Sequence, residues 1–199
     1  MKTLRQIPAR TVRSGVQGRY RFTRYAPAPI EKLVRFRERH RSATTPEEKA
    51  AVWKEFMRGR TPIAVGPWVH NTISEANGHG LNIIARRLCN NRVYDPIITQ
   101  AKIGTGTTPP STTDTDIETV GLANIEPVNQ SFTGGIATIE FFIADIELAN
   151  DTYTEFSIHC GNQLFARSLI EPSHTKGTNE DTTTEYEISF ANAPDEESS

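Results

Sequence analysis

The stretch "GIATIEFFIA" at residues 135–144 decides the fold class of this chain. Within it, Thr138 and Glu140 alternate with Ile139 and Phe141, so polar and apolar side chains follow each other with a period of two. Such alternation predicts a β-strand with one side facing a core and the other facing solvent. We therefore expect a sheet with one buried face.

Four further segments have the same character. They are "PIITQAKIG" (96–104), "YTEFSIHC" (153–160), "QLFARSLI" (163–170) and "TTTEYEISFA" (182–191), each bounded by Gly, Asn, Asp or Pro. Short strands that recur at intervals of about 10–20 residues, with turn-forming residues between them, are typical of antiparallel sandwiches. The second half of the chain is thus predicted to form an antiparallel, jelly-roll-like β-sandwich.

The residues before these strands favour helices. Residues 30–41 are basic and have apolar positions at helical spacing, which predicts a short amphipathic helix. Between residues 45 and 59, Thr45 as N-cap and Glu48 three residues later form a capping box, and Gly59 ends the helix. Both segments are predicted to be helical.

A third helix is expected to begin at a second capping box, Thr72 to Glu75, and to end near Asn90. Gly78 and Gly80 would weaken its middle. Before all the helices, "GRYRFTRYAP" alternates polar and aromatic residues, which predicts a short strand near residues 18–25.

The fold class expected from these patterns is α+β. It comprises an N-terminal extended arm, two to three helices and a C-terminal antiparallel β-sandwich. We expect two regions: a basic arm with docking helices at residues 1–60, and a helix plus the sandwich at residues 61–199, ending in a short acidic tail.

Charge is distributed unevenly along the 199 residues, although the formal net charge is only −2. Residues 1–92 carry 19 Lys and Arg against 6 Asp and Glu, a net of +13. Residues 93–199 carry 3 Lys and Arg against 18 Asp and Glu, a net of −15. This asymmetry predicts two surfaces with different partners, or contact between the basic half and the acidic half of a neighbouring copy.

A docking role is expected for basic and aromatic residues of the arm and for the aromatic face of the second helix. These residues are Arg10, Arg13, Arg19, Arg21, Arg24, Tyr20, Phe22, Tyr25, Trp53 and Phe56. A partly ordered terminus and an ordinary core face are the alternatives for the same residues. The interleaved arginines and aromatics also fit single-stranded nucleic acid, but no recognition motif follows and the net charge is slightly negative, so nucleic acid is not the expected partner.

The glycine-rich stretch "KIGTGTTPPSTTDTDIETVG" (102–121) invites comparison with a phosphate-binding loop. A Walker loop requires Lys followed by Ser or Thr after its last glycine. Here Lys102 precedes the glycines, and Pro109 and Pro110 offer no N–H group to a phosphate. We instead predict an ordered surface loop that acts as a hinge between a helical half and a sandwich half, held by contacts at a subunit edge.

No pattern indicates catalysis, a cofactor or a metal. His70 and His79 are nine residues apart, which does not match metal-ligand spacing, and the alternating Asp114, Asp116 and Glu118 lack the remainder of an EF-hand loop. No nucleophile elbow is present. We expect a non-enzymatic protein with neither a cofactor nor a metal site.

The composition sets the remaining bounds. Hydrophobic residues make up 36% of the chain and charged residues 23%, and there is no apolar run long enough to cross a membrane. The basic, polar N-terminus lacks the apolar core of a signal peptide. The two cysteines are consistent with a reduced protein made in the cytoplasm.

Four segments together resemble a family of small structural proteins of tailed-bacteriophage virions, labelled as tail, fibre-like or virion-associated proteins. The segments are residues 104–109, 114–117, 149–155 and 164–167. The resemblance covers roughly residues 68–190. Ile117 stands where the family usually has Leu, and the basic segment from about Arg10 to Arg60 has no counterpart.

The resemblance implies a virion protein in the tail, baseplate, neck or fibre attachment, docked on other virion proteins and on copies of itself, possibly as a trimer. A capsid decoration or cement protein is the alternative within the same class. A carbohydrate-binding module that recognises a host surface glycan is the alternative from another class; it would require exposed aromatics, for which Phe132, Tyr153 and Tyr186 are the candidates.

Overall fold

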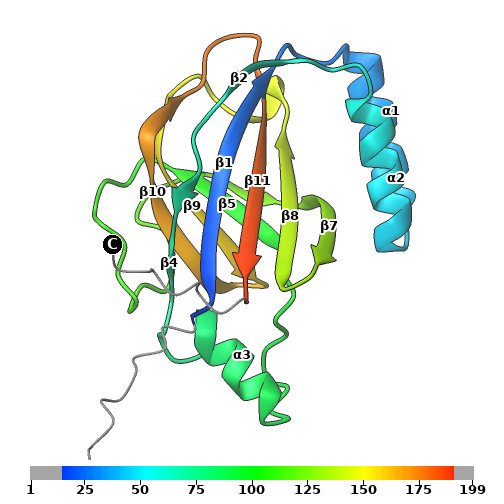
Figure 1. Cartoon of the computed structure of the whole chain (residues 1–199). Coiled ribbons are helices and arrows are strands. Elements are labelled where there is room, and N and C mark those ends of the chain that lie inside the picture. The colour runs from blue at the N-terminus through cyan, green and yellow to red at the C-terminus, as the bar shows by residue number, and fades with distance from the viewer. Residues whose placement is uncertain (1–14, 191–199) are drawn as a thin grey trace, which may run out of the picture.

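The computed structural model describes residues 15–190 and shows two antiparallel sheets packed face to face (Figure 1). The expected α+β class with a β-sandwich is confirmed; the jelly-roll connectivity stays a prediction. Arg10, Arg13 and the acidic tail from residue 191 lie outside the described residues.

The first sheet has six strands. Their spatial order is β2 (Pro62–Val65), β1 (Gln17–Tyr25), β11 (Asp181–Ser189), β8 (Ile136–Ile143) and β7 (Pro127–Thr133), and β3 (Val69–His70) pairs with β1 beside this path. The second sheet has five strands, in the order β4 (Thr72–Ile73), β10 (Gln163–Thr175), β9 (Thr152–Cys160), β5 (Gln100–Gly104) and β6 (Val120–Ile125). A short 3-10 helix (Asp145–Glu147) follows β8.

Aromatic side chains from both sheets fill the core between them. Tyr20 of β1 stacks on Tyr186 of the neighbouring β11, with 6.1 Å between ring centroids. Phe156 reaches across from β9 in the second sheet and approaches Tyr20 at 5.2 Å and Phe22 at 5.4 Å. Large aromatics add substantially to core stability through their area and their ring geometry.

Strand β1 therefore belongs to the sandwich and not to an extended arm. All nine of its residues pair with β11, from Gln17 opposite Ser189 to Tyr25 opposite Asp181. The strand near residues 18–25 is confirmed, but its assignment to an arm is wrong. Tyr20 and Phe22 are buried because the alternation of "RYRF" directs the aromatics to the inner face of the sheet. A division of the chain at residue 60 consequently separates two parts of one sheet.

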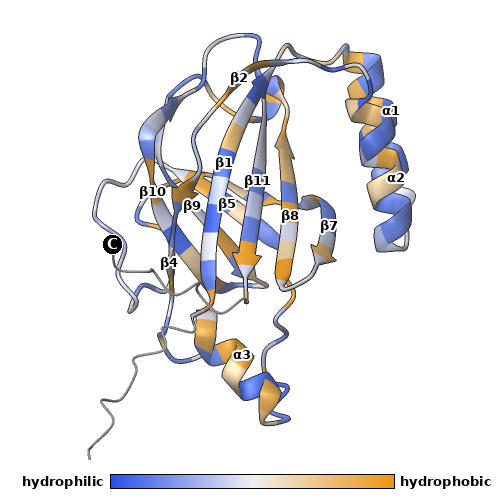
Figure 2. Cartoon of the chain, in the orientation of Figure 1, coloured by the Kyte–Doolittle hydropathy of each residue, from blue (hydrophilic) through white to orange (hydrophobic). Residues whose placement is uncertain are grey.

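Helices α1 (Ile30–Ser42) and α2 (Pro46–Met57) form a hairpin beside β7 and β8 (Figure 1). Both helices are confirmed, and α2 begins with the expected capping box of Thr45 and Glu48. Figure 2 shows hydrophobic and hydrophilic residues side by side along both helices, as expected for elements that bury one face only.

The hairpin closes a second hydrophobic cluster on the outer face of the first sheet. Its buried members are Leu33, Phe36, Trp53, Phe56, Val128, Phe142 and Ala144. Phe142 points to this cluster while its neighbours on β8, Phe141 and Ile143, point to the core between the sheets. The adjacent apolar residues of "FFI" thus serve both faces of the strand.

The third helix is shorter than predicted. Residues Thr72 and Ile73 form strand β4, so the capping box expected at Thr72 is wrong, and α3 extends only over Gly80–Leu88. Gly80 begins the helix instead of weakening its middle. A Cβ atom there would lie 1.9 Å from the carbonyl oxygen of Ser74, so only glycine allows the helix to start this close to the sheet.

The second cluster generates the first prediction. Replacing Trp53, which is 5% exposed, by Ala should lower the free energy of unfolding by about 3–5 kcal/mol, because it removes a large side chain from a packed site. The control is Val34→Ala on the same hairpin, where the side chain is 47% exposed and the expected change is about 0.5 kcal/mol. Urea denaturation measures both; equal effects would show that the hairpin is not packed as described.

Candidate functional site

The residues expected to dock on a partner are mostly engaged within the chain. Tyr20 and Phe22 lie in the main core, and Trp53 and Phe56 lie in the second cluster. Tyr25 is half-buried, and the guanidinium of Arg60 lies 5.3 Å from its ring centroid. The sequence reveals the aromatic pattern but not which side of each element another part of the same chain would cover.

The arginines of β1 face glutamates of β11. Arg19 pairs with Glu187 at 2.6 Å and Arg21 with Glu185 at 2.5 Å, because the register places each arginine directly opposite its glutamate. The guanidinium groups of both arginines also lie over the ring of Trp68, at 4.4 and 4.6 Å from its centroid. These arginines thus pair with groups of the same chain on the outer face of the sheet.

Part of the uneven charge of the two halves is paired inside the molecule. Besides the pairs of Arg19 and Arg21, three ion pairs join the basic half to the acidic half: Arg24 with Glu180, Arg37 with Glu147 and Arg60 with Asp181. The last pair is buried, with the two side chains 8% and 2% exposed. These residues thus have partners within the chain, and the expectation of two surfaces with different partners stays a prediction.

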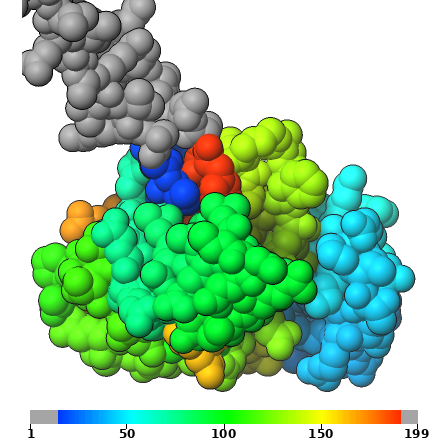
Figure 3. Space-filling model, turned by 90° about the horizontal axis from the view of Figure 1, so that it is seen from below, coloured from blue at the N-terminus to red at the C-terminus, as the bar shows by residue number. Residues whose placement is uncertain are grey.

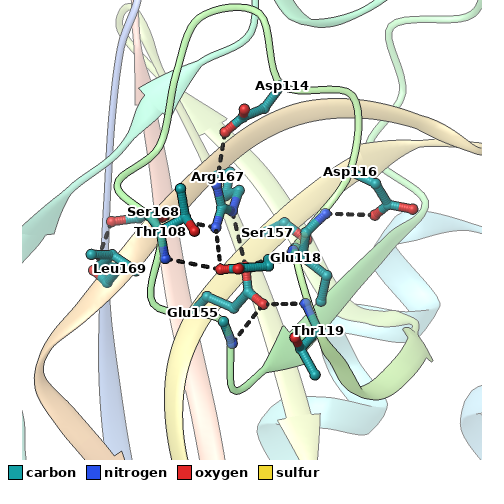
Figure 4. A network of polar contacts seen from close by, with 12 residues as sticks. Thr108, Asp114, Asp116, Glu118, Thr119, Glu155, Ser157, Arg167, Ser168 and Leu169 are labelled. Carbon is teal, nitrogen blue, oxygen red and sulfur yellow. Dashed lines mark hydrogen bonds and ion pairs between the residues drawn. The ribbon is translucent and has the colours of Figure 1, made fainter.

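The loop of residues 105–119 connects β5 to β6 and lies across the outer face of the second sheet (Figure 4). It is an ordered loop, as predicted, but it is not a hinge between two halves, because both flanking strands belong to the same sheet. Its contacts are made within the chain, to side chains of β9 and β10. The loop thus covers polar residues that a sandwich would otherwise leave in solvent.

Glu155 on β9 organises this loop. Its side chain is fully buried, and its carboxylate accepts hydrogen bonds from the backbone N–H groups of Gly106 at 2.9 Å, Glu118 at 3.0 Å and Thr119 at 2.7 Å. Arg167 Nε donates a fourth bond at 2.9 Å. A buried carboxylate requires such a complete set of donors, since an unpaired buried charge costs several kcal/mol.

Arg167 on β10 completes the network. Its side chain is 4% exposed, and beyond Glu155 it donates from Nη1 to the Asp114 carboxylate at 2.8 Å and from Nη2 to the Thr108 carbonyl at 2.9 Å. The planar fork of five N–H donors suits arginine to this role. Figure 4 shows the guanidinium between Asp114 on one side and Glu155 on the other.

The same network explains the glycine that the loop carries at residue 106. A Cβ atom on Gly106 would lie 2.3 Å from the Glu155 Oε1 atom. The backbone can therefore approach the buried carboxylate only because the side chain is absent. This glycine brings the chain close to an anion as a phosphate-binding loop does, but here the anion belongs to the protein.

All four segments of the sequence resemblance meet in this network. Residues 104–109 and 114–117 are the two sides of the loop, residues 149–155 end in the buried carboxylate, and residues 164–167 end in the buried guanidinium. The motifs are distant in sequence because they lie on different strands of one sheet. Sequence reasoning found the segments but missed that Glu155 and Arg167 form their centre.

Ser157, His159 and Asp116 have the residue types of a catalytic triad but not its geometry. Ser157 Oγ lies 2.9 Å from His159 Nε2, and Asp116 Oδ1 lies 3.7 Å from the same nitrogen. A triad requires the carboxylate and the hydroxyl on opposite ring nitrogens. Ser157 and His159 are also fully buried, so no substrate reaches them. The cluster is part of the covered face of the second sheet.

The environment of His159 changes its protonation. Burial, assisted by the nearby ammonium of Lys102, lowers the pKa of His159 to about 4, although Asp116 acts in the opposite direction. Lys102 in turn binds Asp116 at 2.7 Å. The imidazole is therefore neutral beneath the loop at physiological pH.

An apolar groove opens at the end of the sandwich beside α3. Its volume is about 800 Å³, and its floor includes Ile139, Phe165 and Ile188, which are core residues of the two sheets. Its rim includes Phe132, at 88% exposed, and Phe190, at 52% exposed. Figure 2 shows hydrophobic residues gathered at this end, in α3 and in the nearby ends of β8 and β11.

The groove is a large apolar hollow on the surface formed by residues 15–190. Figure 3 views this end and shows the start of β1, the end of β11 and the turn between β7 and β8 close together. Exposed apolar patches of this kind mark interaction sites more often than chance positions do. We therefore take the groove, and not the loop network, as the candidate functional site.

Among the aromatics considered for glycan binding, only one is accessible. Tyr153 and Tyr186 are 2% and 1% exposed, and only Phe132 remains at the surface. Both tyrosines lie on inward-facing positions of their strands and pack into the core. The three residues do not form a common platform.

The Glu155 network generates the second prediction. Glu155→Gln should lower the free energy of unfolding by about 3–5 kcal/mol, because an amide nitrogen cannot accept two of the four hydrogen bonds and the guanidinium of Arg167 loses its buried counter-charge. The matched control is Glu185→Gln, whose pair with Arg21 is about one-third exposed and should contribute at most about 1 kcal/mol. Chemical denaturation measures both. Equal losses would contradict the role of the network.

A third prediction concerns pH. The unfolded chain protonates His159 near its ordinary pKa of 6.5, whereas the folded chain does so only near pH 4. Stability should therefore be complete above pH 6.5 and fall as the pH decreases toward 4, with at most about 3 kcal/mol from this group.

Unfolding free energies measured from pH 7 to pH 4.5 test this dependence. His159→Gln should flatten part of the slope, while the control His70→Gln, at an exposed position, should leave it unchanged. An unchanged slope in the His159 variant would contradict the prediction.

Within residues 15–190, no group of three or more His, Cys, Asp or Glu side chains is placed to hold a metal ion. No helix of that part of the chain has the length and apolar character needed to cross a membrane. Comparison of the sequence with protein-family models and curated proteins, and of the fold with solved structures, finds no match.

Proposed function

We propose that this chain is a non-enzymatic structural component of a tailed-phage virion, made in the host cytoplasm and placed in the tail, baseplate, neck or fibre attachment. In this proposal the β-sandwich is a rigid body displayed in the particle. The chain docks on other virion proteins and on copies of itself through residues 1–14, which include Arg10 and Arg13.

The observation that carries the proposal is the convergence of the four resembling segments on one buried network. Residues 104–109, 114–117, 149–155 and 164–167 come from two strands and the loop that covers them. Motifs that shared only a surface chemistry could lie far apart in the fold. Motifs that hold a loop on a sheet must lie in contact with each other, and their contact in this chain supports a resemblance in fold.

The use of the charged groups supports a structural role over a catalytic one. Glu155 and Arg167 use their hydrogen-bonding groups for contacts within the protein, and Asp116 is paired with Lys102. Catalysis requires an acid, base or nucleophile that is accessible to a substrate. The network instead stabilises the loop on the sheet.

The groove supports the docking part of the proposal. It exposes Phe132, Phe190 and Ile97, although exposed apolar side chains do not stabilise a free monomer. The glycan-binding alternative loses support because Tyr153 and Tyr186 are buried. A capsid decoration or cement role requires the same properties and differs only in location.

The fourth prediction tests the virion role in particles. Purified particles from cells that carry the gene should contain the protein, and gold labelling should place it on the tail, neck or baseplate. Removal of residues 1–14 should reduce its incorporation by about tenfold or more, because the docking segment is lost. Removal of residues 191–199 is the matched control, since it shortens the other end and keeps the basic segment.

Each outcome decides between the alternatives. Label on the capsid surface would support the decoration role instead. Absence of the protein from purified particles, or equal incorporation of the two truncated forms, would contradict the proposal.

A further inference from the structure

We propose that the apolar groove beside α3 binds residues 1–14 of a neighbouring copy of the same chain. The groove is defined by its floor of Ile98, Ile139, Phe165 and Ile188 and by its rim of Ile97, Phe132 and Phe190. The inference deepens the proposed function, because it assigns a receptor to the docking segment. Only the choice of a neighbouring copy as the source of the segment rests on that function.

The groove has the size and chemistry of a peptide-binding site. Its volume of about 800 Å³ lies within the range of about 300–1,000 Å³ that is usual for ligand pockets. It is lined mainly by apolar side chains, and its floor belongs to the core between the sheets. Several apolar side chains of a peptide would fit there, whereas a folded domain would not.

The segment precedes β1, and the start of β1 lies at the same end of the molecule as the groove. Gln17 pairs with Ser189, so the start of β1 lies beside the end of β11, and Phe190 on the groove rim follows directly. Figure 3 shows these two ends in contact next to the turn between β7 and β8. Fourteen residues span at most about 50 Å, which is enough to reach the groove of an adjacent molecule.

The composition of the segment is complementary to this end of the molecule. Residues 1–14 contain Leu4, Ile7 and Val12 among four basic residues and no acidic one. The groove offers apolar surface with the acidic Glu47 on its lining. Apolar side chains would enter the groove, while opposite charges steer and orient the segment.

The choice of a neighbouring copy as the source of the segment rests on the proposed function, in which copies of the chain dock on one another. Ile188 and Phe190 at the end of β11 line the groove one strand away from β1, so the segment of the same chain is within reach as well. Light scattering separates the two sources. In exchange between copies, every copy donates one segment and accepts another, which gives the repeated heterologous contacts from which rings and filaments are built.

The fifth prediction uses purified protein. A fluorescein-labelled peptide of residues 1–14 should bind the chain that lacks these residues, as followed by fluorescence anisotropy. Phe132→Asp should raise the dissociation constant by about tenfold or more, because it places a charge on the apolar rim. Phe132 is 88% exposed, so this substitution leaves the core intact.

The matched controls separate binding in the groove from non-specific hydrophobic binding. Ile63→Asp, at a 58% exposed apolar position on β2 at the far edge of the sheet, should leave the affinity unchanged. A peptide with Leu4→Asp and Ile7→Asp should bind at least about tenfold more weakly. Equal binding to both protein variants would overturn the proposal.

Light scattering of the proteins identifies the source of the segment. The full chain should associate with increasing concentration, whereas the chain without residues 1–14 and the Phe132→Asp variant should remain monomeric. A full chain that stays monomeric while the peptide binds would show that each groove holds its own segment, and would overturn exchange between copies. Association that persists without residues 1–14 would overturn it as well. Neither result alters the test in particles, so failure of this inference and failure of the virion role can be told apart.

Discussion

The antiparallel pairing of β1 with β11 is the constraint on which the rest of the molecule depends. It joins residues 17–25 to residues 181–189 over nine consecutive pairs and thereby brings the two ends of the described chain together. The pairing places Tyr20 and Tyr186 in the core and the arginines of β1 opposite the glutamates of β11. Without it the first sheet would lose β2 and β3 as well, since both pair with β1.

The pairing of β1 with β11 also brings part of the basic half of the sequence into contact with part of the acidic half. A basic first half and an acidic second half attract each other within one molecule, and the register decides which groups meet. Exposed pairs such as Arg19 with Glu187 contribute little individually, whereas the buried pair of Arg60 with Asp181 fixes the chain after α2 against β11. The asymmetry therefore favours a specific arrangement of strands.

The second sheet depends on a different interaction, the buried contact between Glu155 and Arg167. These two charges are tolerated in the interior because the loop of residues 105–119 supplies backbone donors and acceptors to both. Apolar contacts hold the loop less than this polar network does, because Ile117 is the only large apolar side chain that is buried within residues 105–119. The polar network thus holds a cover on the outer face of the second sheet, as the α1–α2 hairpin covers the outer face of the first sheet.

Local patterns were enough to predict much of the fold but little of the site. The strand at β8, the helix at α2 and its cap follow from alternation, helical spacing and capping chemistry, all of which act over a few residues. The third helix was misplaced, because the capping residues at Thr72 and Glu75 were overridden by pairing of β4 with β10. The groove was not predicted at all, since its lining comes from α2, α3, residues 96–98, β7, β8, β10 and the end of β11, which no local pattern connects.

The sequence by itself determined the α+β class, most of the long strands, two helices and the pattern of charge, because these depend on neighbours along the chain. Only the tertiary structure decided that "RYRF" is a core strand and not a docking arm, that the glycine-rich loop surrounds the protein's own carboxylate, and that an apolar groove opens where β1 begins. These features depend on which distant residues meet. That choice is made by the burial of all the apolar faces at once, and no single segment of the sequence encodes it.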